Sequence, residues 1–456
     1  MRRTLAQSLH LEGEVLTPKS PRYDDARRIF ATHIDRRPAV IARVATVDDV
    51  ARVIAHARDT GSELAIRGGG HSPAGHGMSD GIVIDLSALR SFELDLARRT
   101  AWAGAGLTAG AFTAAAGDAG LATGFGDTGS VGIGGITLAG GIGFLVRKHG
   151  LTIDNLLAAE IVTADGRLRH VDAQTEPELF WALRGVKGNF GVVIALEFDV
   201  FPLSRLYAGS IYFPGERTAD VLRAWTAWHP STPETMVTSI AVMRMRAIPD
   251  VPEPLRGKFL VSVRIAYNGT TADGQRMVGP LRAVAPAVLD TVRDMPYTEV
   301  ASIHNEPTDP VPYYERGIML RELPAQAQDK LIELVGPDAE TTLVMAELRA
   351  LGGAWDREPA VPDAVATRGL PYSLLGVSAG PLSQEQQLKR SVAELLDGMK
   401  PWQSDRRYVN NLAPDEAADA AAIYGPERYE RLSSIKRTYD PANMFRLNHN
   451  VMPADD

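Results

Sequence analysis

A histidine follows three consecutive glycines in Arg67-Gly-Gly-Gly-His-Ser72. A second segment runs from Gly124 to Gly143, where nine of the twenty residues are glycine. Glycine allows positive φ angles and lets backbone N–H groups approach a phosphate closely. An isolated glycine pair usually serves a turn or close packing, but two dense segments favour the approach of a ligand. Together they predict a nucleotide cofactor that lies across several loops.

The sequence around these glycines predicts the elements that position them. A strand at 64–67 runs directly into the loop that carries His71, and a second strand is expected at 82–86. Thr46-Val-Asp-Asp49 is typical of a helix N-terminus, and the apolar stripe after it ends at Gly61. The alanine-rich stretch 107–120 predicts a helix. The Asp165-Gly166 turn predicts a hairpin of strands 159–163 and 167–171, and a further strand is expected at 190–200.

Residues 205–400 have a different pattern. Long strands are expected at 206–213, 236–245 and 259–267, with helices between strands, for example at 325–335. Proline-rich stretches near 248–254 and 358–363 predict loops, and the last fifty residues predict short helices. Strands of this length favour a large antiparallel sheet, and the fold class is therefore α+β.

Composition excludes several classes of function. A chain of 456 residues is long enough for two domains, and its net charge of −8 argues against nucleic acid as a partner. The absence of cysteine excludes disulfides, thiolate catalysis and thiolate metal sites. The basic N-terminus lacks the apolar region of a secretory signal, and no apolar run is long enough for a membrane helix. These features favour a cytoplasmic protein that does not bind membranes. With no H-E-x-x-H pair and no G-x-S-x-G elbow, neither a metal site nor a serine hydrolase is expected.

A Rossmann dinucleotide site is the main alternative for the glycines. Gly124-Phe-Gly-Asp-Thr-Gly129 matches G-x-G-x-x-G, and Gly104-Ala-Gly-Leu-Thr-Ala109 matches the looser form. The first does not clearly open a helix, because more glycines follow it. Neither is followed at the right distance by the acidic residue that binds the ribose. The Rossmann interpretation is therefore disfavoured.

Five ordered blocks resemble a known flavoprotein family. They begin at the Arg67–Ser72 motif and continue through 134–143, 147–155 and 178–192. The last comprises Tyr424-Gly-Pro-Glu-Arg-Tyr429, Tyr439-Asp-Pro-Ala-Asn443 and Phe445-Arg446. This order resembles the berberine-bridge-enzyme-like branch of the vanillyl-alcohol-oxidase/PCMH superfamily. The bacterial members that are most similar in pattern include nicotine oxidases and sugar- and antibiotic-tailoring oxidases.

The resemblance implies a domain arrangement and a cofactor. A PCMH-type FAD-binding domain of two α/β subdomains would cover 1–204, the substrate domain 205–400, and a C-terminal segment, 401–456, would complete the FAD domain. In the family, a histidine at the position of His71 is bonded to the flavin 8α-methyl group. His76 is the alternative, but it lies off the motif position. Many plant members add a second link through cysteine, near the position of Thr128. Since this chain has no cysteine, one histidine would make the only covalent bond.

The resemblance also assigns the residues that would contact FAD. The first loop would line the pyrophosphate, the glycine block would approach the flavin and diphosphate, and the other positions would reach the adenosine, adenine or isoalloxazine parts. For the asparagines, turn or cap roles remain open. The predicted set is Arg67, Gly68, Gly69, Gly70, Ser72, Gly129, Ser130, Gly132, Gly135, Ile136, Gly140, Asn155, Val192, Asn448 and Asn450.

Two residues would influence the chemistry. Tyr408-Val-Asn-Asn411 resembles the family's Tyr-x-Asn-aromatic motif, in which the tyrosine is the base, although Asn411 replaces the aromatic residue. An unperturbed tyrosine has a pKa of about 10, so a cation would have to lower it, and a core tyrosine is the alternative. Val131 would occupy the position that controls oxygen access, which favours an oxidase releasing H₂O₂.

The substrate domain offers only general candidates, each of which is more often a packing residue: Tyr313, Tyr314, Arg349, Trp355 and Tyr372. The substrate would be a small alcohol, hemiacetal or amine, with O₂ as the electron acceptor, and the protein a monomer or homodimer. Two alternatives remain open. One is a flavin-dependent dehydrogenase or oxidative cyclase of secondary metabolism that uses another acceptor, and the other is a flavin-binding protein without catalysis.

Overall fold

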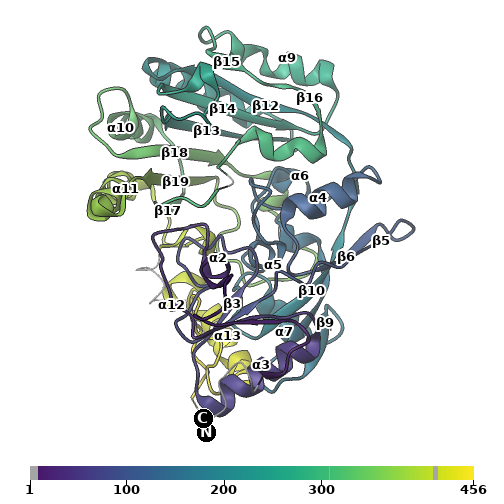
Figure 1. The fold of residues 1–456 in the computed structure, drawn as a ribbon. Coiled ribbons are helices and arrows are strands. Elements are labelled where there is room, and N and C mark those ends of the chain that lie inside the picture. Colours follow the sequence, from purple (N-terminus) through teal and green to yellow (C-terminus); the bar gives the residue numbers. More distant parts are fainter. Residues whose placement is uncertain (1–8, 308, 414–419, 456) are drawn as a thin grey trace.

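The computed structural model describes residues 9–307, 309–413 and 420–455. Figure 1 shows two parts, with a large sheet and its helices above and the N-terminal region below. The C-terminal segment, drawn in yellow, returns to the lower part. Within the described ranges, no helix has the length and apolar character that crossing a membrane requires.

The first sheet positions the loop that carries His71. Its strand order is β1-β2-β4-β3, and β2 and β3 both run parallel to β4. Helix α3 begins after Thr46, whose hydroxyl accepts the Asp49 N–H, and ends at Gly61 with φ +64°. Because the chain leaves β3 at its carboxyl end, the glycine loop lies at the strand edge where ligands commonly bind. The elements are β1 (Glu14–Leu16), α2 (Tyr23–Arg27), β2 (Val40–Arg43), α3 (Val47–Thr60), β3 (Leu64–Arg67) and β4 (Ile82–Asp85).

The second sheet is antiparallel, in the order β5-β6-β10-β8-β9, and includes the predicted hairpin. The predicted helix at 107–120 is shorter, because it begins after the Thr108 cap. Two further strands, β7 and β11, pair with each other. The elements are β5 (Phe92–Asp95), β6 (Thr100–Gly104), α4 (Ala109–Gly117), β7 (Leu121–Ala122), α5 (Ile133–Leu138), α6 (Val146–His149), η1 (Thr152–Asn155), β8 (Leu156–Val162), β9 (Leu168–Asp172), α7 (Pro177–Leu183), β10 (Val192–Asp199) and β11 (Phe201–Pro202).

Three aromatic rings hold the start of the second glycine segment on this sheet. Phe125 contacts Phe112 of α4 and Phe198 of β10, with ring centroids 5.0 and 5.5 Å apart. All three rings are buried, and edge-to-face contacts of this kind stabilise a core beyond the area they bury. The glycine block is thus fixed at its entrance before it turns toward the first sheet.

The third sheet is the predicted large antiparallel one. Its order is β15-β12-β14-β13-β18-β19-β17, and β16 pairs with β12. Helices α8 to α11 cover one face, where Ile240, Val263 and Ile318 belong to their shared core. The elements are β12 (Arg205–Pro214), η2 (Gly215–Arg217), α8 (Thr218–Trp228), η3 (His229–Ser231), β13 (Met236–Arg244), η4 (Glu253–Leu255), β14 (Phe259–Tyr267), α9 (Thr271–Arg282), β15 (Leu289–Asp290), β16 (Arg293–Pro296), η5 (Tyr297–Ile303), β17 (Tyr313–Leu320), α10 (Ala325–Val335), β18 (Leu343–Ala350), η6 (Gly353–Trp355), β19 (Tyr372–Ala379), η7 (Leu382–Gln384) and α11 (Glu385–Met399).

The opposite face of this sheet packs on the glycine block. Val237 and Met319 share a buried cluster with Phe144 and Leu145, which follow Gly143 directly. Side chains of successive strand residues point to opposite faces, so the same strands serve both the helical layer and this contact. The sheet therefore covers the region where the two glycine segments meet.

The C-terminal segment binds to the first part of the molecule. Arg431 lies over the Trp181 ring at 3.9 Å and pairs with Glu178 of α7. The buried Lys436 donates to the carbonyl oxygens of Asn189 and Phe445. The α+β class and the PCMH-like arrangement are thus confirmed, while the boundaries at 204 and 400 stay predictions. The remaining elements are η8 (Lys400–Trp402), η9 (Val409–Asn411), α12 (Ala420–Tyr424) and α13 (Pro426–Tyr439).

Candidate active site

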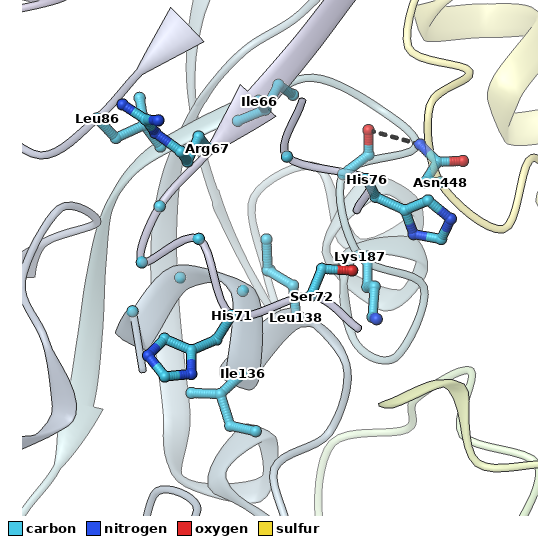
Figure 2. A pocket seen from close by; sticks show the side chains of 18 of the residues that line it. Ile66, Arg67, His71, Ser72, His76, Leu86, Ile136, Leu138, Lys187 and Asn448 are labelled. Carbon is cyan, nitrogen blue, oxygen red and sulfur yellow. Dashed lines mark hydrogen bonds between the residues drawn. The ribbon is translucent and has the colours of Figure 1, made fainter. Parts of the chain in front are cut away.

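A cavity of about 320 Å³ lies where the two glycine segments, β17 and the C-terminal segment meet. Its volume is within the range of small-molecule and cofactor sites. Figure 2 shows His71, Ser72 and Lys187 projecting into this space, with Ile136 and Leu138 beside them. The lining residues are Leu64, Ile66–Pro73, His76, Gly77, Leu86, Ala105, Val131, Gly132, Gly134–Ile136, Leu138, Lys187, Gly188, Gly191, Val193, Glu315, Asn410, Asn411, Phe445, Leu447 and Asn448.

The two glycine segments touch through their backbones. A Cβ atom on Gly69 would lie 2.2 Å from the Gly132 nitrogen, and one on Gly132 would lie 2.3 Å from the Gly69 nitrogen. No side chain can be accommodated at such distances, so both positions require glycine. Gly135, by contrast, has open space where a Cβ would be, and its backbone faces the cavity. The segments thus form a continuous surface that a ligand can approach closely.

The His71 imidazole lies at one end of the cavity. Its ring stacks on Phe30 with centroids 4.4 Å apart, and Phe30 in turn contacts Tyr313 of β17 edge-on. Burial lowers the pKa of His71 to about 4, so the ring is neutral at pH 7. A neutral imidazole has a free nitrogen lone pair and can act as a nucleophile.

Polar atoms on the cavity wall lack partners within the described residues. They include the Ser72 hydroxyl, His76 Nδ1 and Asn448 Oδ1, all buried. Buried polar atoms without hydrogen bonds cost free energy, and a polar ligand would satisfy them. Unsatisfied polar atoms, open glycine backbone and apolar walls fit an elongated nucleotide such as FAD.

Most of the predicted cofactor residues line the cavity. This holds for the three glycines after Arg67, for Ser72, Gly132, Gly135, Ile136 and Asn448, and for the candidate gate Val131. Arg67 also lines it, but its guanidinium points away and donates to Asp85 at 2.7 Å. The contribution of Arg67 to the wall is therefore its backbone and stem, in keeping with the predicted role of backbone amides.

Other predicted positions lie outside the cavity lining. Gly129 and Ser130 precede the lining residues, and the Gly129 carbonyl accepts the Gly110 N–H. Asn155 donates to the Leu151 carbonyl, which is a turn role, and Asn450 donates to Met452 Sδ. Val193 rather than Val192 lines the cavity, because neighbouring side chains of a strand point to opposite faces.

Tyr408 is buried beside the glycine block but is not among the lining residues. Its hydroxyl oxygen accepts the Gly141 N–H at 3.0 Å and the Asn410 amide at 3.2 Å. Burial raises the pKa of Tyr408 to about 12, although these two donors lower it. Its neighbours Asn410 and Asn411 are the residues of the motif that reach the cavity.

The predicted substrate residues fall into separate environments. Tyr313 contacts Phe30, the same ring on which His71 stacks. Tyr314 points to the helical face of the sheet. Trp355 is fully buried and donates to the Leu370 carbonyl, and the Tyr372 hydroxyl bonds His229 at 2.9 Å. Within the described chain, Trp355, Tyr314 and Tyr372 thus pack against other protein groups and do not line the cavity.

Arg349 belongs to a buried ion-pair network between sheet and glycine block. It pairs with Asp127, while the Glu347 carboxylate accepts from Arg264 at 2.8 Å and from His304 at 3.0 Å. Burial opposes ionisation, yet Arg349 and Arg264 hold the pKa of Glu347 well below its usual value. The acidic and histidine atoms lie within 4.8 Å of one another, as a metal site would require. Two guanidiniums already occupy these carboxylates, so we interpret the cluster as ion pairs.

Two charged lining residues were missed by the sequence analysis. Glu315 lies in the middle of β17, and Lys187 follows α7 in a left-handed conformation with φ +59°. The strand Tyr313–Leu320 could have given a signal, because Glu315 and Arg316 interrupt an otherwise apolar run. Sequence alone does not show which of the two charges faces the cavity, since that depends on the register of the sheet.

Comparisons with known proteins support an FAD-binding protein. Residues 38–172 match the family model described as "FAD binding domain", and 407–452 match "Berberine and berberine like". The chain is 30% identical to (R)-6-hydroxynicotine oxidase of Paenarthrobacter nicotinovorans, with 98% of each chain covered. It is 26% identical to a xylooligosaccharide oxidase of Thermothelomyces thermophilus, covering 93% of this chain and 89% of that one.

Solved structures are similar over nearly the whole chain. The crystal structure of 6-hydroxy-D-nicotine oxidase from Arthrobacter nicotinovorans superposes with a TM-score of 0.85 at 28% identity, covering 99% of this chain and 100% of that one. A variant of a BBE-like protein from Physcomitrella patens has a TM-score of 0.86 at 21% identity, with coverage of 99% and 100%. At 21% identity, the similarity to the Physcomitrella patens protein concerns the fold alone.

Proposed function

This chain belongs to the berberine-like family of FAD-linked oxidoreductases, and from that premise we propose that it is an oxidase with one covalent FAD, attached through His71. As a member of the family it is an FAD-dependent enzyme. FAD supplies an acceptor for the hydride that leaves the substrate carbon. The protein positions the cofactor, binds the substrate and controls the route of the proton.

The position of His71 carries the proposal. Its imidazole lines the cavity, and burial lowers its pKa to about 4, which keeps the nucleophilic nitrogen unprotonated at pH 7. The chain contains no cysteine, which excludes a second link through sulfur. His76 also lines the cavity, but it lies beside His449, with ring centroids 4.8 Å apart. His71 is therefore the better candidate for attachment.

The proposed substrate is a small alcohol, hemiacetal or amine, and the proposed acceptor of the electrons is O₂, with release of H₂O₂. The printed names of two relatives, a hydroxynicotine oxidase and a xylooligosaccharide oxidase, cover the amine and sugar classes. Val131 lines the cavity and is a small residue where oxygen would approach. We further propose a cytoplasmic location, because the chain lacks cysteine.

Tyr408 stays a prediction as the base. A phenol with a pKa of about 12 is protonated at neutral pH and can accept a proton only after it has ionised, and two donors already occupy its oxygen. The remaining predicted contacts, Gly129, Ser130, Gly140, Asn155 and Asn450, also stay predictions.

Acid precipitation of the purified protein tests the covalent bond. The pellet is expected to stay yellow, and the intact mass to exceed that of the chain by one FAD. His71→Ala should release all of the flavin on precipitation, whereas His76→Ala should retain it. Flavin that remains wholly in the supernatant with the wild-type protein would exclude the bond but not FAD binding.

Anaerobic bleaching of the flavin tests the activity. The panel should contain cyclic amines with a hydroxypyridine group, oligosaccharides and polyketide alcohols. We expect at least one class to bleach the flavin, and admission of air to restore its colour with formation of H₂O₂. Bleaching that air does not reverse within seconds would favour a dehydrogenase over an oxidase.

A further inference from the structure

Glu315 lines the cavity from strand β17 of the large antiparallel sheet. On β17, Tyr314 and Ile318 point to the helical core, so Glu315 points to the opposite face. On that same face Gly317 packs under Asn411, whose Cβ would lie 2.9 Å from a Cβ on Gly317. Asn411 itself donates to the Ser373 hydroxyl at 3.1 Å. Asn410, Asn411 and Glu315 thus form one polar wall, opposite the glycine loops.

Glu315 is the single carboxylate among the described residues that line the cavity. Its side chain is half-buried and lines the cavity. The described chain contributes no hydrogen bond or ion pair to its carboxylate. An unpaired carboxyl group that faces a cofactor cavity is costly to maintain, which makes it a candidate for function.

Lys187 faces the same cavity from the loop between α7 and β10. Its backbone adopts φ +59°, a left-handed conformation that is unfavourable for a non-glycine residue. The Lys187 N–H donates to the Leu138 carbonyl at 2.9 Å, which holds the loop in place. Strain of this kind concentrates at functional sites. Figure 2 shows the Lys187 side chain reaching into the cavity beside Ser72.

The charges around Glu315 set its protonation. Burial and the Glu306 charge raise the pKa of Glu315 to about 8, while the Lys187 ammonium lowers it. Burial in turn lowers the pKa of Lys187 to about 8. The other titratable groups near this space are Tyr313 on the same strand and His71, His76 and His449 around the cavity. A carboxyl poised near neutral pH suits proton transfer.

We propose that Glu315, in place of Tyr408, is the proton acceptor of the reaction and that Lys187 is the positioning residue that sets its ionisation. The O–H or N–H proton of the substrate passes to the Glu315 carboxylate. The hydrogen on the adjacent carbon leaves with its bonding electron pair to FAD. The substrate therefore loses two electrons and two hydrogens, and its C–O or C–N single bond becomes a double bond. Glu315 afterwards returns its proton to solvent. This inference rests on the proposed function.

Anaerobic stopped-flow reduction across pH 6 to 10 tests it, with any substrate that bleaches the wild-type enzyme. The rate constant for reduction should rise with pH, pass its midpoint near pH 8 and level off at higher pH, since only the ionised carboxylate accepts a proton. Glu315→Gln should lower the plateau at least about 100-fold and remove the pH dependence. Glu315→Asp should restore part of the rate. Substrate dissociation constants should change little.

Lys187→Met should move the midpoint of the pH profile upward, because the cation that lowers the pKa of Glu315 is lost. Glu322→Gln is the matched control, since Glu322 follows the same strand but is exposed. Its profile should equal that of the wild type. Bound FAD and thermal unfolding should be measured for every variant, so that loss of fold is recognised.

A second readout does not depend on turnover. The absorbance spectrum of the bound flavin, titrated without substrate, should show a transition near pH 8 that Glu315→Gln abolishes. Wild-type rate and pH profile in Glu315→Gln would overturn the inference and leave the oxidase proposal intact. If no substrate bleaches the wild-type flavin, the oxidase proposal fails, and the spectral titration alone decides whether Glu315 ionises beside the flavin. No transition there overturns the inference.

Discussion

Gly69 and Gly132 each occupy the space in which the other would place a side chain. The clash is with backbone atoms, which cannot rotate away as a flexible side chain can. Replacement of either residue must separate the two segments that form the cavity wall. The requirement for glycine here comes from close approach, and φ plays no part in it.

Gly69→Ala should therefore impair both the fold and the cofactor site. We expect a loss of about 3 kcal/mol in the free energy of unfolding, typical of severe overpacking, and little bound FAD. Gly279→Ala is the matched control, because nothing lies within 4 Å of its Cβ position in helix α9. Because Gly279 precedes Pro280, which disfavours a helical residue with a Cβ, the gain in helix propensity is offset, and the free energy of unfolding should change by less than about 1 kcal/mol with bound FAD unaffected. Urea unfolding and the ratio of flavin to protein absorbance measure both effects. Full FAD loading in Gly69→Ala would contradict this account.

At the residue scale, the sequence motif predicted the cavity wall better than the chemistry within it. His71 and the glycines beside it were found because a loop motif specifies its own backbone. Glu315 and Lys187 were not, since their direction depends on strand register and on a left-handed turn. Val193 replaced Val192 for the same reason, as a shift of one residue reverses a strand's faces.

At the scale of elements, one ion pair joins the glycine block to the large sheet. Asp127 lies between Phe125 and the cavity-lining Val131, and Arg349 is on β18. The Arg349 guanidinium also reaches Glu347, so four neighbouring charges balance one another. Loss of one anion would leave excess positive charge buried in the interface.

Asp127→Asn should destabilise the protein by about 2–4 kcal/mol, because Arg349 then lacks its main partner. Glu234→Gln removes a pair with Arg357 in which both side chains are about half exposed. That change should cost at most about 1 kcal/mol, since water replaces an exposed partner. Thermal unfolding of both variants at low and high salt gives the comparison. Equal losses would show that burial does not govern the contribution of the pair.

Long elements were predicted well, and so were the short strands β3 and β4, but other short strands were missed. The strands β12, β13 and β14 and the helices α3 and α10 lie close to their expected ranges, because alternation or helical periodicity persists over several turns. Two- to four-residue strands such as β15 and β16 pair with β12 only through tertiary contacts, and no local pattern marks them. The helix predicted at 107–120 is shorter at both ends, spanning Ala109–Gly117. The alanine-rich sequence carries no clear signal for where the helix stops.

At the scale of the molecule, several buried histidines make stability depend on pH. Burial lowers the pKa of His149 and of His229 to about 4 and that of His449 to about 3. Above about pH 6.5 these groups are neutral in both states and have no effect. As the pH falls below that value, the unfolded chain binds protons that the folded chain does not. The free energy of unfolding therefore decreases toward pH 4.

Urea unfolding at pH 7.5, 6.0 and 5.0 should show this decrease. Each fully shifted group contributes up to about 1.4 kcal/mol per pH unit. His149→Phe keeps the stacking on Phe201, whose ring centroid is 3.8 Å from that of His149, and should make the slope shallower. Stability that is constant from pH 7.5 to 5.0 would contradict the prediction.

The position of the C-terminal segment has a consequence for biosynthesis. Phe445, Leu447 and Asn448 complete the cavity, and Lys436 fastens their segment to Asn189. These residues leave the ribosome after the glycine loops and the whole large sheet have been made. The cavity therefore stays open on one side throughout translation. The proposed attachment of flavin to His71 would therefore be a late event, and a ribosome-bound chain stalled before residue 420 should hold no covalent flavin.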